Sequence, residues 1–223
     1  MLIDLSHPIE SGMITYKGLP APVVCDYLSR EASRAIYAPG TEFQIGKIEM
    51  VANTGTYLDC PFHRYADGKD LSQLALAQLA DLPGVFIDAE NLLAIGPEVF
   101  AGRNLRHKAV LVHTGWCRHW RTDAYFENHP FLTADSASYL AAQEVKLVGI
   151  DSHNIDDTRG NTRPVHSRLL GQEILIAEHL TDLHVLRGRE FTFSAVPPRF
   201  VGVGTFPVRA FARLTTASST QTP

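Results

Sequence analysis

Residues 53–63 read N-T-G-T-Y-L-D-C-P-F-H, and they decide the fold more than any other stretch of the chain. The segment places the carboxylate of Asp59 four residues before the imidazole of His63, with Pro61 imposing a turn between them. Such a pair can hold a metal ion and can take or return a proton. If the segment is an extended strand, residues 53, 55, 57 and 59 point to one face. The side chains of Asn53 and Tyr57 then line the same site as Asp59.

The chain on either side of this segment alternates between short β-branched runs and helical patterns. The β-branched runs predict strands at residues 43–51, 85–88, 109–113, 145–151, 174–177 and 191–195. Helices are predicted at residues 71–82 and 133–143, the second beginning at Thr133, which can accept from the free amides of the first turn. The pattern predicts one mixed α/β domain over residues 1–214, followed by a flexible polar tail at residues 215–223.

Composition excludes several classes of partner. A net charge of -4 gives no basic surface for nucleic acid or for an anionic membrane. The sequence has no apolar run near the roughly 20 residues that a membrane span needs. Cys25, Cys60 and Cys117 form neither a disulfide framework nor a CxxC zinc site. We therefore expect a cytoplasmic protein that acts on a small molecule.

Residues 53–63 resemble H-x-G-T-H-x-D-x-P-x-H, the signature of the cyclase family of metal-dependent hydrolases, the family of kynurenine formamidase and isatin hydrolase. Gly55, Thr56, Asp59, Pro61 and His63 match this signature, whereas residues 53 and 57 stand where the family has histidines. Further segments resemble the family in the same order, namely D-L-S-H-P-I at 4–9, T-G-W at 114–116, G-I-D-S at 149–152, V-H at 165–166 and E-H-L-T-D-L at 178–183, where the family has E-N-L-x-N-L. The resemblance implies a single-domain swivelling β/β/α fold with a mixed sheet.

The resemblance also implies a set of site residues. In the family, the two signature histidines and the aspartate bind one metal, and the aspartate bridges to a second metal held by a later histidine and glutamate. Carried over, the second set is intact as Asp59, His166 and Glu178, and His63 takes the place of the family's acid or base. The first set survives only through Asp59. We therefore expect one divalent metal, zinc or manganese, on Asp59, His166 and Glu178.

The chemistry of these side chains agrees with that expectation. Two carboxylates and one imidazole leave a position for water, and a metal there lowers the pKa of that water to about 7. The amide oxygen of Asn53 is a poor zinc ligand, and Tyr57 must lose a proton with a reference pKa near 10 before it binds well. The first metal position is thus predicted to be empty or weak. Tyr57 then either donates a hydrogen bond to a substrate carbonyl or, with Asn53, merely fills a lost site.

Several other side chains near these motifs have two interpretations. Cys60 should face away from the site as a small buried hydrophobe, the alternative being a nucleophilic thiol beside His63. Asp151 and Asp156 either line a pocket or hold a loop by hydrogen bonds. Arg64 either clamps a substrate carboxylate or is a solvated surface residue.

Two classes of function follow from the sequence. The first is a hydrolase of a C–N bond in a small amide, formamide or lactam, with metal-activated water, His63 as general acid/base and Tyr57 polarising the carbonyl. The second is a metal-free family member that binds a small molecule, or that uses His63 and Asp59 for acid–base chemistry without metal. The resemblance further implies a homodimer or homotetramer whose N-terminal region reaches toward a neighbouring subunit.

Overall fold

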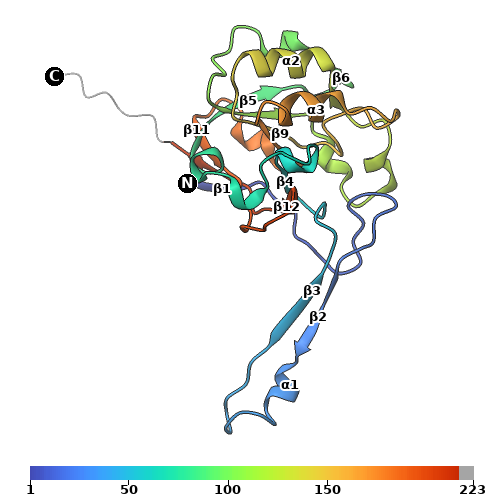
Figure 1. Ribbon diagram of the computed structural model, residues 1–223, viewed down its shortest axis with the longest axis vertical. Coiled ribbons are helices and arrows are strands. Elements are labelled where there is room, and N and C mark those ends of the chain that lie inside the picture. Colours follow the sequence, from blue (N-terminus) through green and yellow to red (C-terminus); the bar gives the residue numbers. More distant parts are fainter. Residues whose placement is uncertain (216–223) are drawn as a thin grey trace, which may run out of the picture.

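The computed structural model describes residues 1–215, and it builds them around one large mixed sheet (Figure 1). Apart from Thr215, the tail predicted for residues 215–223 lies outside the described residues. Four central strands are parallel and the flanking strands are antiparallel to their neighbours. In spatial order the strands are β1 (Leu2–Asp4), β13 (Phe211–Leu214), β11 (Phe191–Ser194), β5 (Leu82–Asp88), β7 (Ala109–His113), β9 (Leu147–Ile150), β10 (Leu175–Glu178), β4 (Tyr57–Asp59) and β12 (Thr205–Pro207).

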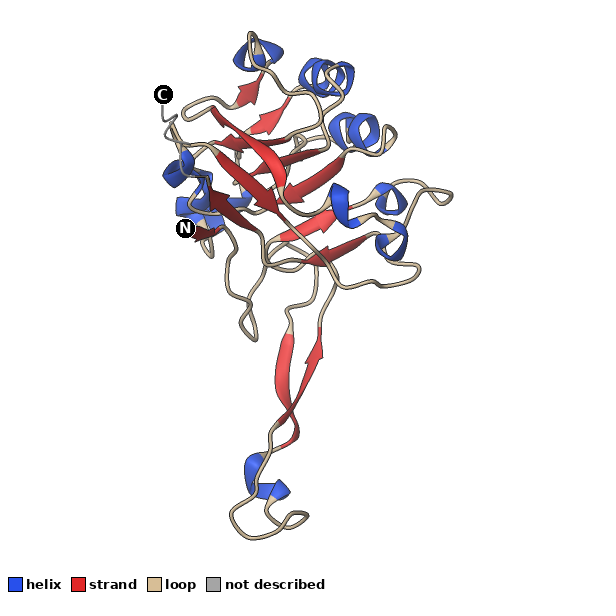
Figure 2. Ribbon diagram, turned by 90° about the vertical axis from the view of Figure 1, so that its left-hand side faces the viewer, coloured by secondary structure: helices blue, strands red, loops and turns tan. Residues whose placement is uncertain are grey.

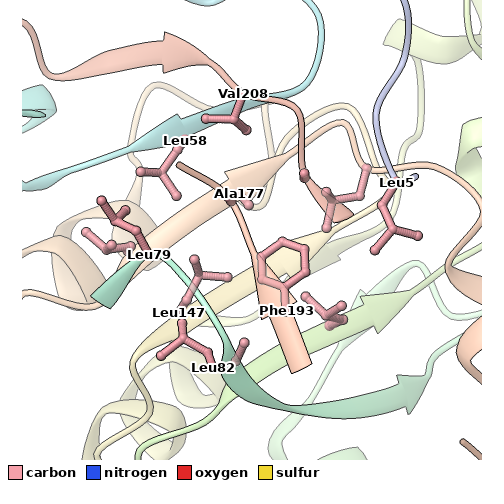
Figure 3. Close-up of a cluster of buried hydrophobic side chains, with 14 of the residues drawn as sticks. Leu5, Leu58, Leu79, Leu82, Leu147, Ala177, Phe193 and Val208 are labelled. Carbon is pink, nitrogen blue, oxygen red and sulfur yellow. The ribbon is translucent and has the colours of Figure 1, made fainter. Parts of the chain in front are cut away.

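The central strands form because their side chains are apolar on both faces, as buried parallel strands require. Every residue of β7 and β9 is buried. Side chains alternate along a strand, so Leu111 joins one apolar cluster and its neighbours Val110 and Val112 join another. The first cluster, which contains Leu147 and Phe193, is shown in Figure 3. The sheet thus has a separate hydrophobic core on each face.

Helices cover one of these two faces. Helices α2 (Ala134–Ala142) and α3 (Pro164–Leu170) contribute Leu140 and Leu169 to the cluster that contains Val110. The predicted N-cap of α2 is confirmed, because the Thr133 hydroxyl accepts from the Ser136 amide at 3.2 Å. The connections hold short 3-10 helices and one small strand pair: η1 (Pro61–His63), η2 (Leu71–Gln73), η3 (Leu76–Gln78), η4 (Pro97–Phe100), η5 (Trp116–His119), η6 (Asp123–Phe126), η7 (Leu183–Leu186), and β6 (Ala94–Ile95) with β8 (Phe131–Leu132).

The six predicted strands all exist, with ends that differ by a few residues. The prediction of residues 109–113 matches β7 at both ends, and β3 (Ile45–Glu49), β5, β9, β10 and β11 overlap the other five predictions. The presence of these strands is well predicted because a short apolar or β-branched run is a local signal. The ends are less well predicted because hydrogen bonding to neighbouring strands sets them.

The helix predicted for residues 71–82 is wrong. The structure has η2 and η3 there, separated by extended backbone at Leu74 and Ala75, and β5 begins at Leu82. The side chain of Asp70 accepts from the Ser72 amide at 2.9 Å, and Gln78 accepts from the Ala75 amide at 3.2 Å. These side-chain bonds satisfy the backbone within each short turn, so a continuous helix does not form.

The extended strand predicted through residues 53–59 is also wrong in part. Strand β4 begins only at Tyr57, and Gly55 has a left-handed φ of 67° that turns the chain just before it. A side chain at Gly55 would also collide with Ile9, because a Cβ built there lies 2.9 Å from the Ile9 side chain. Strand alternation therefore relates Tyr57 to Asp59 but does not reach Asn53.

A long hairpin extends from the body of the molecule (Figures 1 and 2). It consists of β2 (Val23–Leu28) and β3, paired antiparallel, with the short helix α1 (Arg30–Ser33) near its tip. We call residues 23–49 the arm. Its exposed apolar side chains are Val23, Val24, Tyr27, Ile36, Tyr37, Phe43, Ile45 and Ile48. Within the described residues, no helix is both long and apolar enough to cross a membrane.

Candidate active site

Three neighbouring strands and one helix bring the predicted site residues together. Strand β4 lies between β10 and β12, so Asp59 is near Glu178 on one side and directly opposite Thr205 on the other. Helix α3 carries His166. Residues far apart in sequence are thereby placed around one point at this end of the sheet.

The imidazole of His166 is at the centre of this group. Its Nε2 lies 3.7 Å from Oδ2 of Asp59 and 3.8 Å from Oε1 of Glu178. The side chains of both acids are 1% exposed. His63 completes the group, since Asp59, His63 and His166 each offer a ligand atom within 4.8 Å of the others. The structure thus brings together the four residues predicted as metal ligands and as acid/base, namely Asp59, His63, His166 and Glu178.

A divalent metal fits these residues. Oδ2 of Asp59 is buried and has no hydrogen-bond partner among the described residues. A buried carboxylate oxygen without a partner is costly, and a cation is the natural group to satisfy it. The donor set, one imidazole nitrogen and two carboxylate oxygens, suits zinc or manganese.

Asp156 holds His166 in position. Its Oδ1 accepts from the Val165 amide at 2.8 Å, while Oδ2 accepts from the His166 amide at 3.0 Å and lies 2.6 Å from His166 Nδ1. Helix α3 begins with Pro164, and Arg163 before it makes no side-chain cap, so Asp156 caps the helix from the preceding loop. The carboxylate fixes the ring with Nε2 turned toward Asp59 and Glu178, as outer carboxylates commonly do for metal-binding histidines.

The buried charges shift the pKa values of the central groups. Burial lowers the pKa of His166, but the hydrogen bond to Asp156 and the carboxylates of Asp59 and Glu178 outweigh burial and raise the pKa well above its usual value. Burial also raises the pKa of Glu178 above its usual range, and the charge of Asp59 adds to this effect. Without a metal, the surrounding carboxylates therefore favour the protonated form of the His166 imidazole.

A hydroxyl that the sequence did not indicate connects His63 to Asp59. The Thr205 hydroxyl donates to Oδ1 of Asp59 and lies 2.8 Å from Nδ1 of His63. A hydroxyl has one proton, so the Thr205 oxygen accepts from His63 Nδ1–H, and in the neutral imidazole Nε2 is the acceptor nitrogen. His63 is one-third exposed and lines the pocket, where Nε2 can exchange a proton with a bound molecule.

Tyr57 has a different partner from the one expected. Its hydroxyl donates to Oε2 of Glu178 at 2.6 Å, and burial raises its pKa well above 10. Because the hydroxyl has a single proton, this geometry does not support the predicted hydrogen bond from Tyr57 to a substrate carbonyl. His179 Nε2 lies 3.3 Å from the same hydroxyl, and burial lowers the pKa of His179 well below its usual value, so the ring is neutral.

A pocket of about 680 Å³ opens over the group. As predicted, Asn53 and Tyr57 both line it, although a loop rather than a strand carries Asn53. Arg64 lines it too, and its Nε donates to Ser167 Oγ at 3.1 Å. The lining residues are Tyr16, Leu19, Asn53, Tyr57, His63, Arg64, Asn154, Asn161, Thr162, Arg163, Pro164, His166, Ser167 and Glu178.

Two of the open interpretations are decided by packing. Cys60 is fully buried in an apolar cluster, and burial raises its pKa to about 11, which disfavours a nucleophilic thiolate. Asp151 holds a loop, because its carboxylate accepts from the Thr114 amide at 2.7 Å and from the Gly115 amide at 2.9 Å.

Comparison with known proteins gives consistent matches along the chain. A family model described as "Putative cyclase" matches residues 3–157. A kynurenine formamidase of Bacillus cereus is 30% identical over 95% of this chain and 96% of the relative, and one of Bacillus mycoides is 29% identical over the same shares.

Solved structures share the fold. Isatin hydrolase A from Labrenzia aggregata superposes with a TM-score of 0.79 at 19% identity, over 95% of this chain and 93% of that one. A potential metal-dependent hydrolase with cyclase activity gives a TM-score of 0.76 at 23% identity, over 95% and 96% of the two chains. These likenesses confirm the predicted α/β fold with its mixed sheet.

The role of Asp156 gives a test of stability. An Asp156→Asn substitution places an NH2 group against the amides or ring of residues 165–166, so buried donors lose their acceptor. We expect the free energy of unfolding in urea to fall by about 3–5 kcal/mol. The matched control is Asp157→Asn, because Asp157 is next in sequence but is paired with the exposed Arg159. Equal stability of the two variants would contradict the assigned role.

Proposed function

The chain is a hydrolase of the cyclase family, and on that premise we propose that it cleaves a C–N bond in a small amide, formamide or lactam with the help of one divalent metal. The family match and the kynurenine formamidase relatives support the reaction class. One observation carries the metal dependence: the unpartnered, buried Oδ2 of Asp59 beside His166 Nε2, with Oε1 of Glu178 near the same nitrogen.

Asp59, His166 and Glu178 would hold the metal, zinc or manganese. When bound there, a divalent metal lowers the pKa of water and polarises a carbonyl, which supplies a nucleophile near neutral pH. Asp156 orients His166 toward the metal, and Tyr57 holds Glu178 by a hydrogen bond. These five side chains prepare the site before any substrate arrives.

His63 would move the protons of the reaction. Its Nδ1–H is held by Thr205, whose own proton is held by Asp59, so Nε2 is the free nitrogen. In the first half of the reaction this nitrogen takes a proton from the attacking water. In the second half it returns a proton to the leaving nitrogen, which must be protonated for the C–N bond to break.

The pocket fits a small substrate. Its volume of about 680 Å³ lies within the range of small-molecule sites, and His63, His166 and Glu178 all line it. The amide side chains of Asn53, Asn154 and Asn161 line the same pocket and can bond both the donor and the acceptor of an amide or lactam group.

We expect metal binding to release protons and to strengthen as pH rises. The pKa of His166 is raised in the metal-free protein, so a proton must leave before Nε2 can bind metal. About one proton per metal should therefore be released from His166, and below neutral pH a further proton from Glu178, whose pKa is raised to about 7. Affinity should rise at least about tenfold per pH unit. Calorimetric titration in two buffers of different ionisation enthalpy measures this release.

Two substitutions that each remove a proposed ligand test the metal site. Asp59→Ala and His166→Ala should each abolish binding. The control is Glu90→Ala, in a second group of possible ligands formed by Asp88, Glu90 and His113. That group has partners of its own, since Arg187 lies 2.9 Å from Asp88. Binding that survives in Asp59→Ala, or no binding in the wild type, would contradict the proposed metal site.

The role of His63 predicts a loss of activity without a loss of metal. His63→Gln should lower kcat/KM toward aryl formamides and lactams by about 10²- to 10⁴-fold, because it removes the acid/base group. Metal content should stay unchanged. Thr205→Val should give a smaller loss that Thr205→Ser restores, and the exposed His107→Gln serves as control. Full activity in His63→Gln would refute the assignment.

We further propose that the protein is a homo-oligomer, dimer or tetramer, in which the arm packs on a second copy. The arm exposes large apolar side chains, with Tyr27 78% and Ile48 62% exposed, more than a monomer normally leaves in water. The arm carries charges of both signs, and two ion pairs lie within it, Arg34–Glu42 at 2.6 Å and Lys47–Glu49 at 3.7 Å. An apolar surface with balanced charge suits another copy of the chain better than a polyanion.

Substitutions on the arm test this proposal. Tyr27→Glu with Ile48→Glu should shift the mass measured by light scattering from oligomer to monomer, because charges would be buried in the interface. The control is Leu76→Glu, which is also on an exposed apolar side chain but lies on the body. A wild-type monomer, or an unchanged oligomer in the double variant, would refute the role of the arm.

We also propose a cytoplasmic location. All three cysteines are free, including the exposed Cys25. Free thiols are typical of proteins from reducing compartments.

A further inference from the structure

Behind Glu178, three buried aromatic side chains form a hydrogen-bonded chain. Tyr125 Oη lies 2.9 Å from Nδ1 of His179, and Nε2 of His179 lies 3.3 Å from Oη of Tyr57. Tyr57 Oη in turn lies 2.6 Å from Oε2 of Glu178. All three aromatic residues are at most 1% exposed, so water does not compete for these bonds.

The direction of the chain follows from counting protons. An ionised Glu178 can only accept, so the single proton of Tyr57 points to it. The Tyr57 oxygen then accepts from His179 Nε2–H. A neutral imidazole has one N–H, so Nδ1 of His179 accepts from the hydroxyl of Tyr125. Every donor in the chain is thus aimed toward the carboxylate.

The hydrogen-bonded chain includes two positions at which the related family has different residues. Tyr57 stands where the family signature has a ligand histidine, and His179 follows Glu178 where the family block has asparagine. We infer that Tyr125, His179 and Tyr57 together position Glu178 as a ligand and replace the first metal of the family, so that this protein holds a single metal. The inference rests on the proposed metal at Asp59, His166 and Glu178.

The hydroxyl groups around the site explain why one metal suffices. The Tyr57 hydroxyl donates to Oε2 of Glu178, and the Thr205 hydroxyl donates to Oδ1 of Asp59. Each carboxylate therefore has one oxygen held by a hydroxyl and the other near His166 Nε2. A tyrosine that donates its proton to a carboxylate cannot also be a metal ligand, and Asn53 alone does not make a site.

Two substitutions of His179 separate the hydrogen bonds from packing. In His179→Gln, the side-chain amide can still donate to Tyr57 and accept from Tyr125, whereas His179→Leu does neither. Zinc stoichiometry and affinity would be measured by titration against a competing chelator. Tyr125→Phe is a milder variant that removes only the last hydroxyl, and Tyr139→Phe on α2 is its control, since the Tyr139 ring packs against the apolar core.

The expected result is one zinc per chain in the wild type and in His179→Gln, with near-equal affinity. Affinity should fall by about 10- to 100-fold in His179→Leu and by less in Tyr125→Phe, as is typical when hydrogen bonds behind metal ligands are lost. Two zinc ions per wild-type chain, or wild-type affinity in His179→Leu, would overturn the inference.

A second measurement needs no metal. In the metal-free protein, at a pH where Glu178 is ionised, the ¹⁵N shifts of His179 should show a proton on Nε2 and none on Nδ1, and Tyr125→Phe should change the Nδ1 shift. A proton on Nδ1 would overturn the inferred direction. If no zinc binds while these shifts are as expected, the proposed metal-dependent function is wrong, and so is the single-metal role. The inferred direction of the hydrogen bonds from Tyr125 to Glu178 would still hold.

Discussion

Two carboxylates buried beside one imidazole nitrogen are the constraint on which the rest of the site depends. An ionised carboxylate that loses water without gaining partners costs several kcal/mol. Here a hydroxyl holds one oxygen of each acid, Thr205 for Asp59 and Tyr57 for Glu178, and the Ile155 amide donates to Glu178 at 2.6 Å. The two oxygens nearest His166 Nε2, Oδ2 of Asp59 and Oε1 of Glu178, support the proposed cation site.

The sheet makes this arrangement possible because it places β4 between β10 and β12. The cross-strand register sets Thr205 opposite Asp59 and Glu178 opposite Tyr57, so each acid is near its hydroxyl without any loop having to move. Two apolar clusters, one on each face of the sheet, pack against these strands. A site carried by packed strands keeps its geometry better than one carried by loops.

The proposed role of Tyr57 is to replace a metal ligand of the family with a hydrogen-bond donor. A histidine at position 57 would offer a ligand nitrogen, whereas Tyr57 offers a proton that Glu178 accepts. His179 and Tyr125 extend this hydrogen bonding. His179 Nε2 donates to the Tyr57 oxygen, and the Tyr125 hydroxyl donates to Nδ1 of His179. A buried hydrogen-bonded network of this kind is stable only when every member has its partner.

The sequence by itself indicated the fold class, the central strands, the cap of α2 and four candidate site residues, Asp59, His63, His166 and Glu178. The strands and the cap follow from local signals, namely apolar runs and a capping threonine, whereas the four candidates follow from the resemblance to the cyclase family. Only the tertiary structure revealed Thr205, His179 and Tyr125, whose hydrogen-bond partners lie 146, 122 and 54 residues away. It alone also showed that the Tyr57 hydroxyl donates to Glu178. The helix predicted for residues 71–82, in contrast, is broken by local bonds of the Asp70 and Gln78 side chains. A side chain's partner depends on which distant strands pack beside it, and no local pattern in the sequence encodes that.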